Sequence, residues 1–442
     1  MRQNIIQLFF ILTSFSLFGQ ENLSLSQAIE MGLNNSFQIQ ISEVNTQIAQ
    51  NNNNWGMSGK YPTVNFSITL PNSFTDQNNP TSFLPELSAF STGLTPAIEA
   101  QWVLFDGYRV RFTKQQFEKL EELAQGEAKV AVENTIQAII LAYQAALIQK
   151  EQIRVLETVL DLSRDRIKYE QVKLEFGQSG KFNLLQIQDA YLSDSTNYLI
   201  QKNTYEIALR NLNLAMGLDD LSSTFTLTDQ LNFETSSYTL EDLKDKMFSN
   251  NQSINNLLIN KELSNIQTKI QESQNYPRIA IGAGGNYNLS NSTVNANTRE
   301  GFKLDTSATI KSLNAFLNVT ATYNIFDGGV RKRQIENAKL NEMVAGLQID
   351  ELKRTLSGQL ENTLATFNNQ RQLVLLTQNL IENAEENLRI ADERFKGGLI
   401  TSFDYRTIQL NFINASQARL NAIFNLKTTE TDLIKLIGGL IR

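Results

Sequence analysis

Histidine and cysteine are both absent from the 442-residue sequence. Their absence excludes Ser-His-Asp and Cys-His catalysis, disulfide bonds and the usual zinc sites, since each of these needs one of the two side chains. A hydrolase that works with carboxylates alone is the weakest reading, because no paired acids stand in a pocket-like context. We therefore predict no enzymatic activity, no cofactor and no metal site.

Long basic runs and phosphate-binding glycine loops are missing too. The formal net charge is -7, and no basic block is long enough to follow a phosphate backbone. The stretch GAGGN at 282–286 lies inside a strand-like alternation and lacks the spacing of a Walker or dinucleotide loop. Nucleic acid is therefore not expected as a partner.

Proline is scarce and unevenly placed. Five of the six prolines lie between Pro62 and Pro96, and the sixth is Pro277. Residues 97–276 and 278–442 therefore lack the residue that most reliably ends a helix, so long helices are permitted.

The first 20 residues have the pattern of a secretory signal peptide. One early positive charge precedes an apolar stretch from Ile5 to Phe18, and cleavage is predicted near Gly19 or Gln20. A membrane anchor is the weaker interpretation because the stretch is short for a span. No later segment has about 18 uninterrupted apolar residues, which predicts no transmembrane helix in the mature chain. Such a chain would have to enter a membrane with strands.

What is present is an internal repeat. The two Phe-Asp-Gly motifs, at Phe105 and Phe326, are 221 residues apart, which is half of the chain. Further landmarks share this spacing, namely Gly177 with Gly398, Phe182 with Phe403, Asn183 with Asp404 and Gly217 with Gly438. The Tyr-Pro pairs at 61–62 and 276–277 are 215 residues apart, so the second copy has gained a short loop insertion. We predict repeats at 21–217 and 239–442, joined by a linker at 218–238.

Each copy has the same expected order of elements. A helix, about 239–274 in the second copy, leads to the Tyr-Pro pair. A heptad rhythm then predicts long helices at about 107–176 and 328–396, which pack as coiled coils and continue after a glycine turn into helices at about 182–216 and 402–437. One such long helix extends about 100 Å.

Alternation of apolar and polar residues predicts four strands, at about 62–70, 97–105, 278–289 and 313–326. Each is about long enough to cross a bilayer, and the polar segments near 71–96 and 290–312 are expected to be exterior loops. Four strands cannot close a barrel, and open edges are not tolerated in lipid, so several chains would share one. A soluble sandwich explains the alternation equally well in isolation.

The motifs at the strand ends predict a membrane interface. Asp106 and Asp327 are candidate N-caps of the long helices, and Gly107 and Gly328 would ease the turn from strand to helix. The nearby cations oppose the helix dipole, which indicates binding to anionic lipid headgroups. The predicted interface residues are Tyr61, Trp102, Phe105, Arg109, Arg111, Tyr276, Tyr323, Phe326, Arg331, Lys332 and Arg333.

These features together resemble the TolC-type outer-membrane efflux protein family. The residues that carry the resemblance are the signal peptide, the doubled Tyr-Pro and Phe-Asp-Gly motifs, and the pattern from Phe395 through Gly398 to Asp404. It implies a mainly α fold with transmembrane β: long coiled-coil helices forming a periplasmic α-barrel, and four strands per chain in a 12-stranded outer-membrane barrel of a homotrimer. It also implies an exit duct of a tripartite efflux or type I secretion system for small molecules, metals or polypeptides, with a periplasmic adaptor protein and an inner-membrane transporter as partners.

In that family the turns between long and short helices form the periplasmic tip, with an acidic aperture. Asp404 matches an aperture carboxylate, whereas the family's second acid is Thr407 here, the basic residue at Ile400 is absent, and Asn183 is the first-copy counterpart. The implied adaptor-docking tip comprises Gly177, Ser179, Gly398, Ile400, Thr401 and Ser402. A plain helix N-cap is an equally good interpretation of Asp404. A periplasmic coiled-coil adaptor or scaffold that never enters lipid is the alternative function.

Overall fold

The computed structural model describes residues 21–231 and 237–441, and the predicted signal peptide lies outside them. The chain divides into two compact units. One contains, of the described residues, those up to 43, those of 127–254 and those from 352 onward. The other contains residues 44–126 and 255–351. The long helices run through both units.

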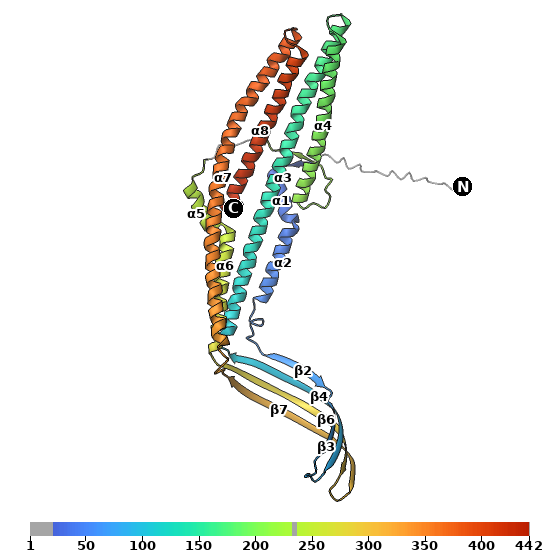
Figure 1. Cartoon of the computed structure of the whole chain (residues 1–442), viewed down its shortest axis with the longest axis vertical. Helices are drawn as coiled ribbons and strands as arrows, with labels where there is room; N and C mark the ends of the chain where they lie inside the picture. The colour runs from blue at the N-terminus through green and yellow to red at the C-terminus, as the bar shows by residue number, and fades with distance from the viewer. Residues whose placement is uncertain (1–20, 232–236, 442) are drawn as a thin grey trace, which may run out of the picture. The chain divides into compact units, whose positions relative to one another are not determined.

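Four helices form two hairpins related by the repeat (Figure 1). Helices α3 (Arg109–Glu175) and α7 (Val330–Lys396) have 67 residues each, and α4 (Lys181–Ala215) and α8 (Ser402–Leu436) have 35 each. A helix of 67 residues extends about 100 Å at 1.5 Å per residue. The predicted fold class of long paired helices with strands is confirmed.

Shorter helices precede each hairpin: α1 (Leu25–Asn35) and α2 (Phe37–Asn52) in the first copy, and α5 (Leu240–Asn250), α6 (Gln252–Glu272) and the short η1 (Ser273–Asn275) in the second. The single helix predicted at about 239–274 is therefore wrong, because Asn251 is extended and separates α5 from α6. The Asn251 side chain accepts from the Ile254 N–H and donates to the Leu436 carbonyl. Ser36 makes the equivalent break between α1 and α2.

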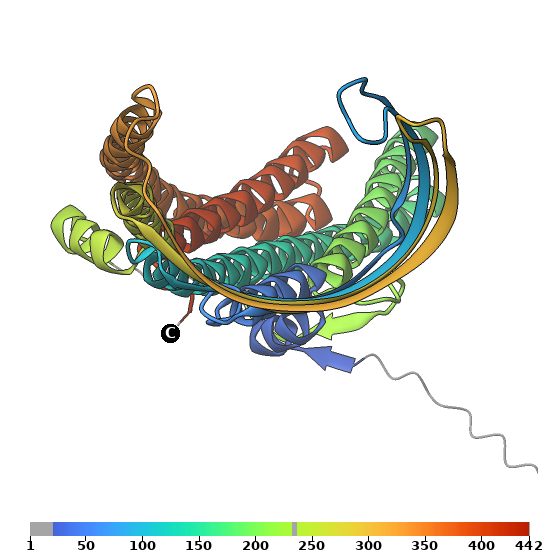
Figure 2. The same ribbon diagram turned by 90° about the horizontal axis from the view of Figure 1, so that it is seen from below.

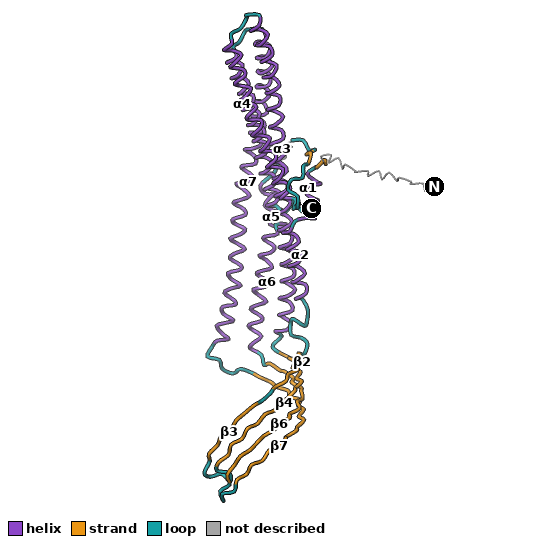
Figure 3. The backbone as a smooth tube through the Cα atoms, turned by 90° about the vertical axis from the view of Figure 1, so that its right-hand side faces the viewer, coloured by secondary structure: helices purple, strands orange, loops and turns teal. Residues whose placement is uncertain are grey.

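The larger sheet is antiparallel and strongly curved (Figure 2). Its strands are β2 (Thr63–Thr69), β3 (Asn72–Asn78), β4 (Glu86–Phe105), β6 (Arg278–Asn297) and β7 (Lys303–Thr322). Both β2 and β3 pair with β4, one after the other, so the chain fills four strand positions in the order β2/β3–β4–β6–β7. Figure 3 shows the same strands in orange, lying side by side.

The long loops predicted at 71–96 and 290–312 are wrong, since most of these residues are in strands. Strands β4, β6 and β7 are 20 residues long, and the connecting turns occupy only residues 79–85 and 298–302. The distal halves carry polar side chains on both faces, as in Asn72–Asn78, so they give no alternating signal. Backbone pairing with the neighbouring strands extends them nevertheless.

The proximal half of the sheet has one apolar and one polar face. Cross-strand rows on the apolar face are Val64–Ala100–Ala283–Leu317 and Phe66–Ile98–Gly285–Ala315. Rows on the opposite face are Asn65–Glu99–Gly284–Phe316 and Ser67–Ala97–Asn286–Asn314. The apolar face continues from Leu94 to Leu104 along β4, which is about the length that crosses a bilayer.

The helical unit containing the N-terminal strand has its own core. β1 (Glu21–Leu23) pairs in parallel with β5 (Phe225–Leu227), and Leu23 and Leu227 are buried with Tyr143 of α3. The Asp229 carboxylate accepts from the Tyr143 hydroxyl at 2.6 Å and from the Leu25 N–H at 2.7 Å. Burial, followed by this hydrogen bond, raises the pKa of Tyr143, which keeps the phenol protonated.

Helix α3 is the one helix, within the described residues, that is long and apolar enough to span a membrane. Its apolar side chains Ile139, Tyr143 and Leu147 are buried in the core just described. Packing within the protein therefore accounts for its composition.

Candidate functional site

The two helix turns have nearly the same backbone. Gly177 and Gly398 both have a left-handed φ, of 68° and 71°. The next residue in each turn donates its N–H back into the preceding helix, from Gln178 to the Lys173 carbonyl and from Leu399 to the Arg394 carbonyl. Figure 1 shows both turns at the same end of their unit. The repeat therefore preserves the turn geometry.

The caps that follow the turns differ in charge. Thr401 is the N-cap of α8, and with Asp404 it forms a capping box: Asp404 N–H donates to the Thr401 hydroxyl, and its carboxylate accepts from the Thr401 N–H. The interpretation of Asp404 itself as the N-cap is therefore wrong by three residues. In the first copy Gly180 is the N-cap and has no side-chain bond, while the Asn183 amide donates to Ser179.

Asp404 is exposed and ionised. The Thr401 hydroxyl donates to its carboxylate at 2.7 Å and, together with the Thr401 N–H, holds the pKa of that carboxyl below its usual value. Thr407 is also exposed and donates to the Phe403 carbonyl within its own helix. Ser402 is buried, and Ile400 packs against the neighbouring core.

A buried polar layer joins the two hairpins, and the sequence reasoning missed it. The Arg406 guanidinium of α8 donates two hydrogen bonds, of 2.6 and 2.8 Å, to the Asp194 carboxylate of α4. The Asp194 side chain is 1% exposed and that of Arg406 is 21% exposed. Gln409 accepts from Arg406 and donates to Ser163 of α3 at 3.0 Å. This layer bonds α8 to both helices of the first hairpin.

A buried cation lies in the same layer. The Arg166 guanidinium of α3 lies 3.8 Å from the ring centroid of Tyr405 and 4.8 Å from that of Phe395. Burial lowers the pKa of Arg166 to about 10, so it stays charged at neutral pH, and burial raises the pKa of Tyr405 to about 12. The aromatic faces attract the guanidinium electrostatically.

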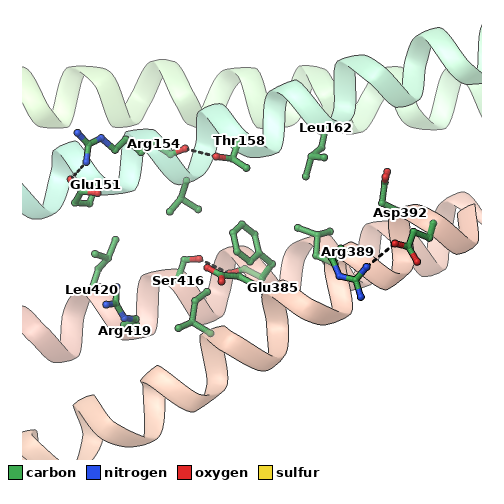
Figure 4. A pocket seen from close by; sticks show the side chains of 15 residues that line it. Glu151, Arg154, Thr158, Leu162, Glu385, Arg389, Asp392, Ser416, Arg419 and Leu420 are labelled. Atoms are coloured by element: carbon green, nitrogen blue, oxygen red, sulfur yellow. Dashed lines mark hydrogen bonds and ion pairs between the residues drawn. The ribbon is translucent and has the colours of Figure 1, made fainter. Parts of the chain in front are cut away.

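A groove of about 540 Å³ lies beside this layer, between α3, α7 and α8 (Figure 4). Its interior is apolar, with Val155, Leu162, Ile381, Leu388, Phe412 and Leu420. Charged side chains surround it, including the paired Glu151 and Arg154 and the paired Arg389 and Glu393. Such a groove fits the apolar face of an additional helix.

Aromatic side chains gather where the strands meet the long helices. Phe105, Tyr108 and Tyr276 contact one another edge to face, with centroids 5.4–6.5 Å apart. The Trp102 indole donates to the Lys60 carbonyl at 2.8 Å. The remaining aromatic residues predicted here, Tyr61, Tyr323 and Phe326, are exposed.

Asp106 and Asp327 cap the long helices, but each lies two residues before the N-cap position, the role that was predicted for it, because the helices begin at Arg109 and Val330. Two of the nearby cations have partners within the chain. Asp106 accepts from the Val110 N–H and from the Arg109 side chain, and Asp327 accepts from the Gly329 and Arg331 N–H groups. The Arg331 guanidinium donates to the carbonyls of Gln274 and Asn324. These contacts explain why Arg109 and Arg331 are tolerated near the helix N-termini despite the unfavourable helix dipole, without any need for lipid. Arg111, Lys332 and Arg333 are exposed.

Known structures share this fold. VceC, an outer membrane protein of Vibrio cholerae, matches with a TM-score of 0.73 and 16% identity over 94% of this chain and 96% of that one. The CmeC outer membrane channel of Campylobacter jejuni matches with 0.72 and 16% identity over 99% and 94%. The open state of the MtrE outer membrane channel of Neisseria gonorrhoeae matches with 0.67 and 16% identity over 94% and 89%. No curated protein matches the chain.

With its curved sheet and duplicated helical hairpins, the chain therefore has the fold of these outer-membrane channel structures. The outer membrane efflux protein family model matches residues 243–439. This match lies within the second repeat, and the resemblance found in the sequence is confirmed.

Proposed function

We propose that the protein is the outer-membrane exit duct of an efflux or secretion system. The observation that carries this proposal is the sheet, whose proximal half has one apolar and one polar face. Among the described residues, its outer strands β2/β3 and β7 each pair on one side only. An apolar face of bilayer length suits lipid, and the polar face suits a water-filled interior. Unpaired edges in lipid require further strands.

Three copies of the chain supply these strands. Four strand positions from each of three chains give a twelve-stranded barrel, which is wide enough for water. Two chains would give only eight strands, and side chains largely fill the interior of a barrel of that size. The exposed β2/β3 edge of one copy would pair with the β7 edge of the next, in a heterologous contact that closes a ring. The helical hairpins would then surround the same axis in the periplasm.

A periplasmic adaptor protein and an inner-membrane transporter are the proposed partners. The turns around Gly177 and Gly398 are exposed and would meet the adaptor, and the apolar groove between α3, α7 and α8 would accept one of its helices. Co-purification with a cross-linked adaptor tests this assignment. The periplasmic scaffold is disfavoured by the apolar face, because large side chains such as Val64, Phe66 and Leu317 would be exposed to water.

Surface labelling tests the proposed function. Single cysteines at Ser82 and Glu300, in the short turns, should react with an impermeant maleimide on intact cells, because these turns end the strands outside the membrane. A cysteine at Ser222, between α4 and β5, should react only after permeabilisation. Labelling of all three only after permeabilisation, or recovery of the chain in the soluble periplasm, would refute the duct.

We infer that Asp404 forms part of the aperture. Three-fold symmetry would repeat it as a ring of three ionised carboxylates, which attracts cations, while Asn183 adds no charge. Asp404→Asn should therefore reduce cation selectivity several-fold in planar bilayers, and Thr407→Val should leave it unchanged. An unchanged reversal potential in a salt gradient, with normal trimer assembly, would show that Asp404 serves only its capping box.

A further inference from the structure

A second groove, of about 580 Å³, lies on the apolar face of the sheet. Its floor is β6, where Ala283 and Gly285 present almost no side chain to this face. Its walls are Phe66 and Ile98 on one side and Leu313 on the other, with Tyr287 at one end. The register explains the depression, because Gly285 lies between Ile98 and Ala315, and the next row on this face places Ala283 between Ala100 and Leu317.

The opposite face of β6 has a similar depression, but the chain fills it itself. The Phe316 ring lies over Gly284, so that a Cβ on this glycine would come within 2.9 Å of the ring. On the apolar face a Cβ on Gly285 would meet only the Asn314 carbonyl, at 3.2 Å. One side of β6 is therefore closed by the protein, and the other is left open.

We propose that this groove binds an acyl chain of a phospholipid, an inference that rests on the proposed membrane insertion. The groove is in the middle of the apolar band, where acyl chains are the surrounding solvent and water does not enter. An unfilled depression loses dispersion contacts on one side, and a flexible hydrocarbon chain restores them. A chain packed against Phe66, Ile98 and Leu313 is held by shape more closely than its neighbours on the flat remainder of the sheet.

The position of the groove along the strands indicates which leaflet of the membrane supplies the bound phospholipid. Ile98 is four residues, about 13 Å along the strand, from Trp102 in the aromatic cluster at the helical end of the band. A phospholipid with its headgroup at that cluster, near the exposed Arg111, Lys332 and Arg333, would reach the groove with the end of its acyl chain. Lys311, in register with Leu289, is the cation at the other end of the band and would anchor lipid A instead.

Photolabelling of the full-length protein in nanodiscs tests the proposal. A phospholipid with a diazirine at the end of one acyl chain should cross-link preferentially to β4, β6 and β7 peptides at the groove. Ala283→Leu and Gly285→Leu, which fill the groove, should each reduce this labelling at least five-fold. Ala321→Leu adds the same bulk to the same face outside the groove and should leave the labelling unchanged. Ala283→Leu keeps the test valid if Gly285→Leu disturbs the backbone, since Ala283 already has a Cβ.

Three results would overturn the acyl-chain site. These are even labelling over the whole apolar face, an equal loss with Ala321→Leu, and preferential labelling by a lipid A probe with the same diazirine. Failure of the chain to enter nanodiscs would contradict the exit-duct proposal instead. Insertion with even labelling would contradict the acyl-chain site alone.

Discussion

Arg406→Ala should be strongly destabilising, by about 3–5 kcal/mol, because it leaves a buried carboxylate without its cation. The Asp194 side chain is 1% exposed and receives both of its charged hydrogen bonds from Arg406. Asp194→Ala should cost less, since the Arg406 side chain is 21% exposed and can regain water. Thermal unfolding in detergent, followed by far-ultraviolet circular dichroism, measures both effects.

The double variant Asp194→Ala/Arg406→Ala is the matched control. Removing both charges should recover part of the stability lost with Arg406→Ala alone, because no unpaired carboxylate then remains buried. Strictly additive losses in this cycle would mean that the pair contributes only packing. A variant at the exposed pair Arg164 and Asp161 should change the stability by less than about 1 kcal/mol.

Gly107→Ala should be the more damaging of two equivalent glycine substitutions. Gly107 and its repeat counterpart Gly328 have the same left-handed φ, of 70° and 68°. A Cβ on Gly107 would lie 2.2 Å from the Ser273 carbonyl oxygen, whereas a Cβ on Gly328 meets nothing within 4 Å. Backbone strain alone predicts a loss of about 1–2 kcal/mol for Gly328→Ala. The added clash raises the expected loss for Gly107→Ala to about 2–5 kcal/mol.

The same unfolding assay separates these two costs, because the conformational strain is common to both variants. Equal losses would mean that the segment around Ser273 yields without cost, and that the junction of β4 with α3 is less tightly packed than the structure indicates. A larger loss for Gly328→Ala would contradict the argument outright.

The long helices could be predicted because their signal is local and repeated. Heptads without proline continue through α3 and α7, so no tertiary information is needed to recognise them. The proximal strands were recognisable for a similar reason, since one face is apolar and the other polar, so that the two kinds of residue alternate along each strand. The distal strands were not, because polar side chains predominate on both of their faces and only pairing with β4 and β7 extends them.

The same distinction between local signals and tertiary contacts applies to the candidate sites. The turn residues were found because glycine at 177 and 398 marks a backbone conformation that the sequence displays directly. The polar layer was missed because Ser163, Asp194 and Arg406 come from three helices, and each resembles an ordinary surface residue in its own helix. The comparison of the two repeats held a usable signal for this layer. Ser163 and Asp194 are polar, whereas the residues 221 positions after them, in the second repeat, are both alanine.

The pairing of β1 with β5 sets an order on the assembly of the first repeat. β1 is the first described element, yet its parallel partner lies about 200 residues later, as does Asp229, which holds Leu25 and Tyr143. A chain that emerges from its N-terminus therefore presents Leu23 without a neighbour until α3 and α4 have followed. β1 can therefore pair only after the first hairpin and β5 have been synthesised, so residues 21–23 are among the last parts of the first repeat to reach their final positions.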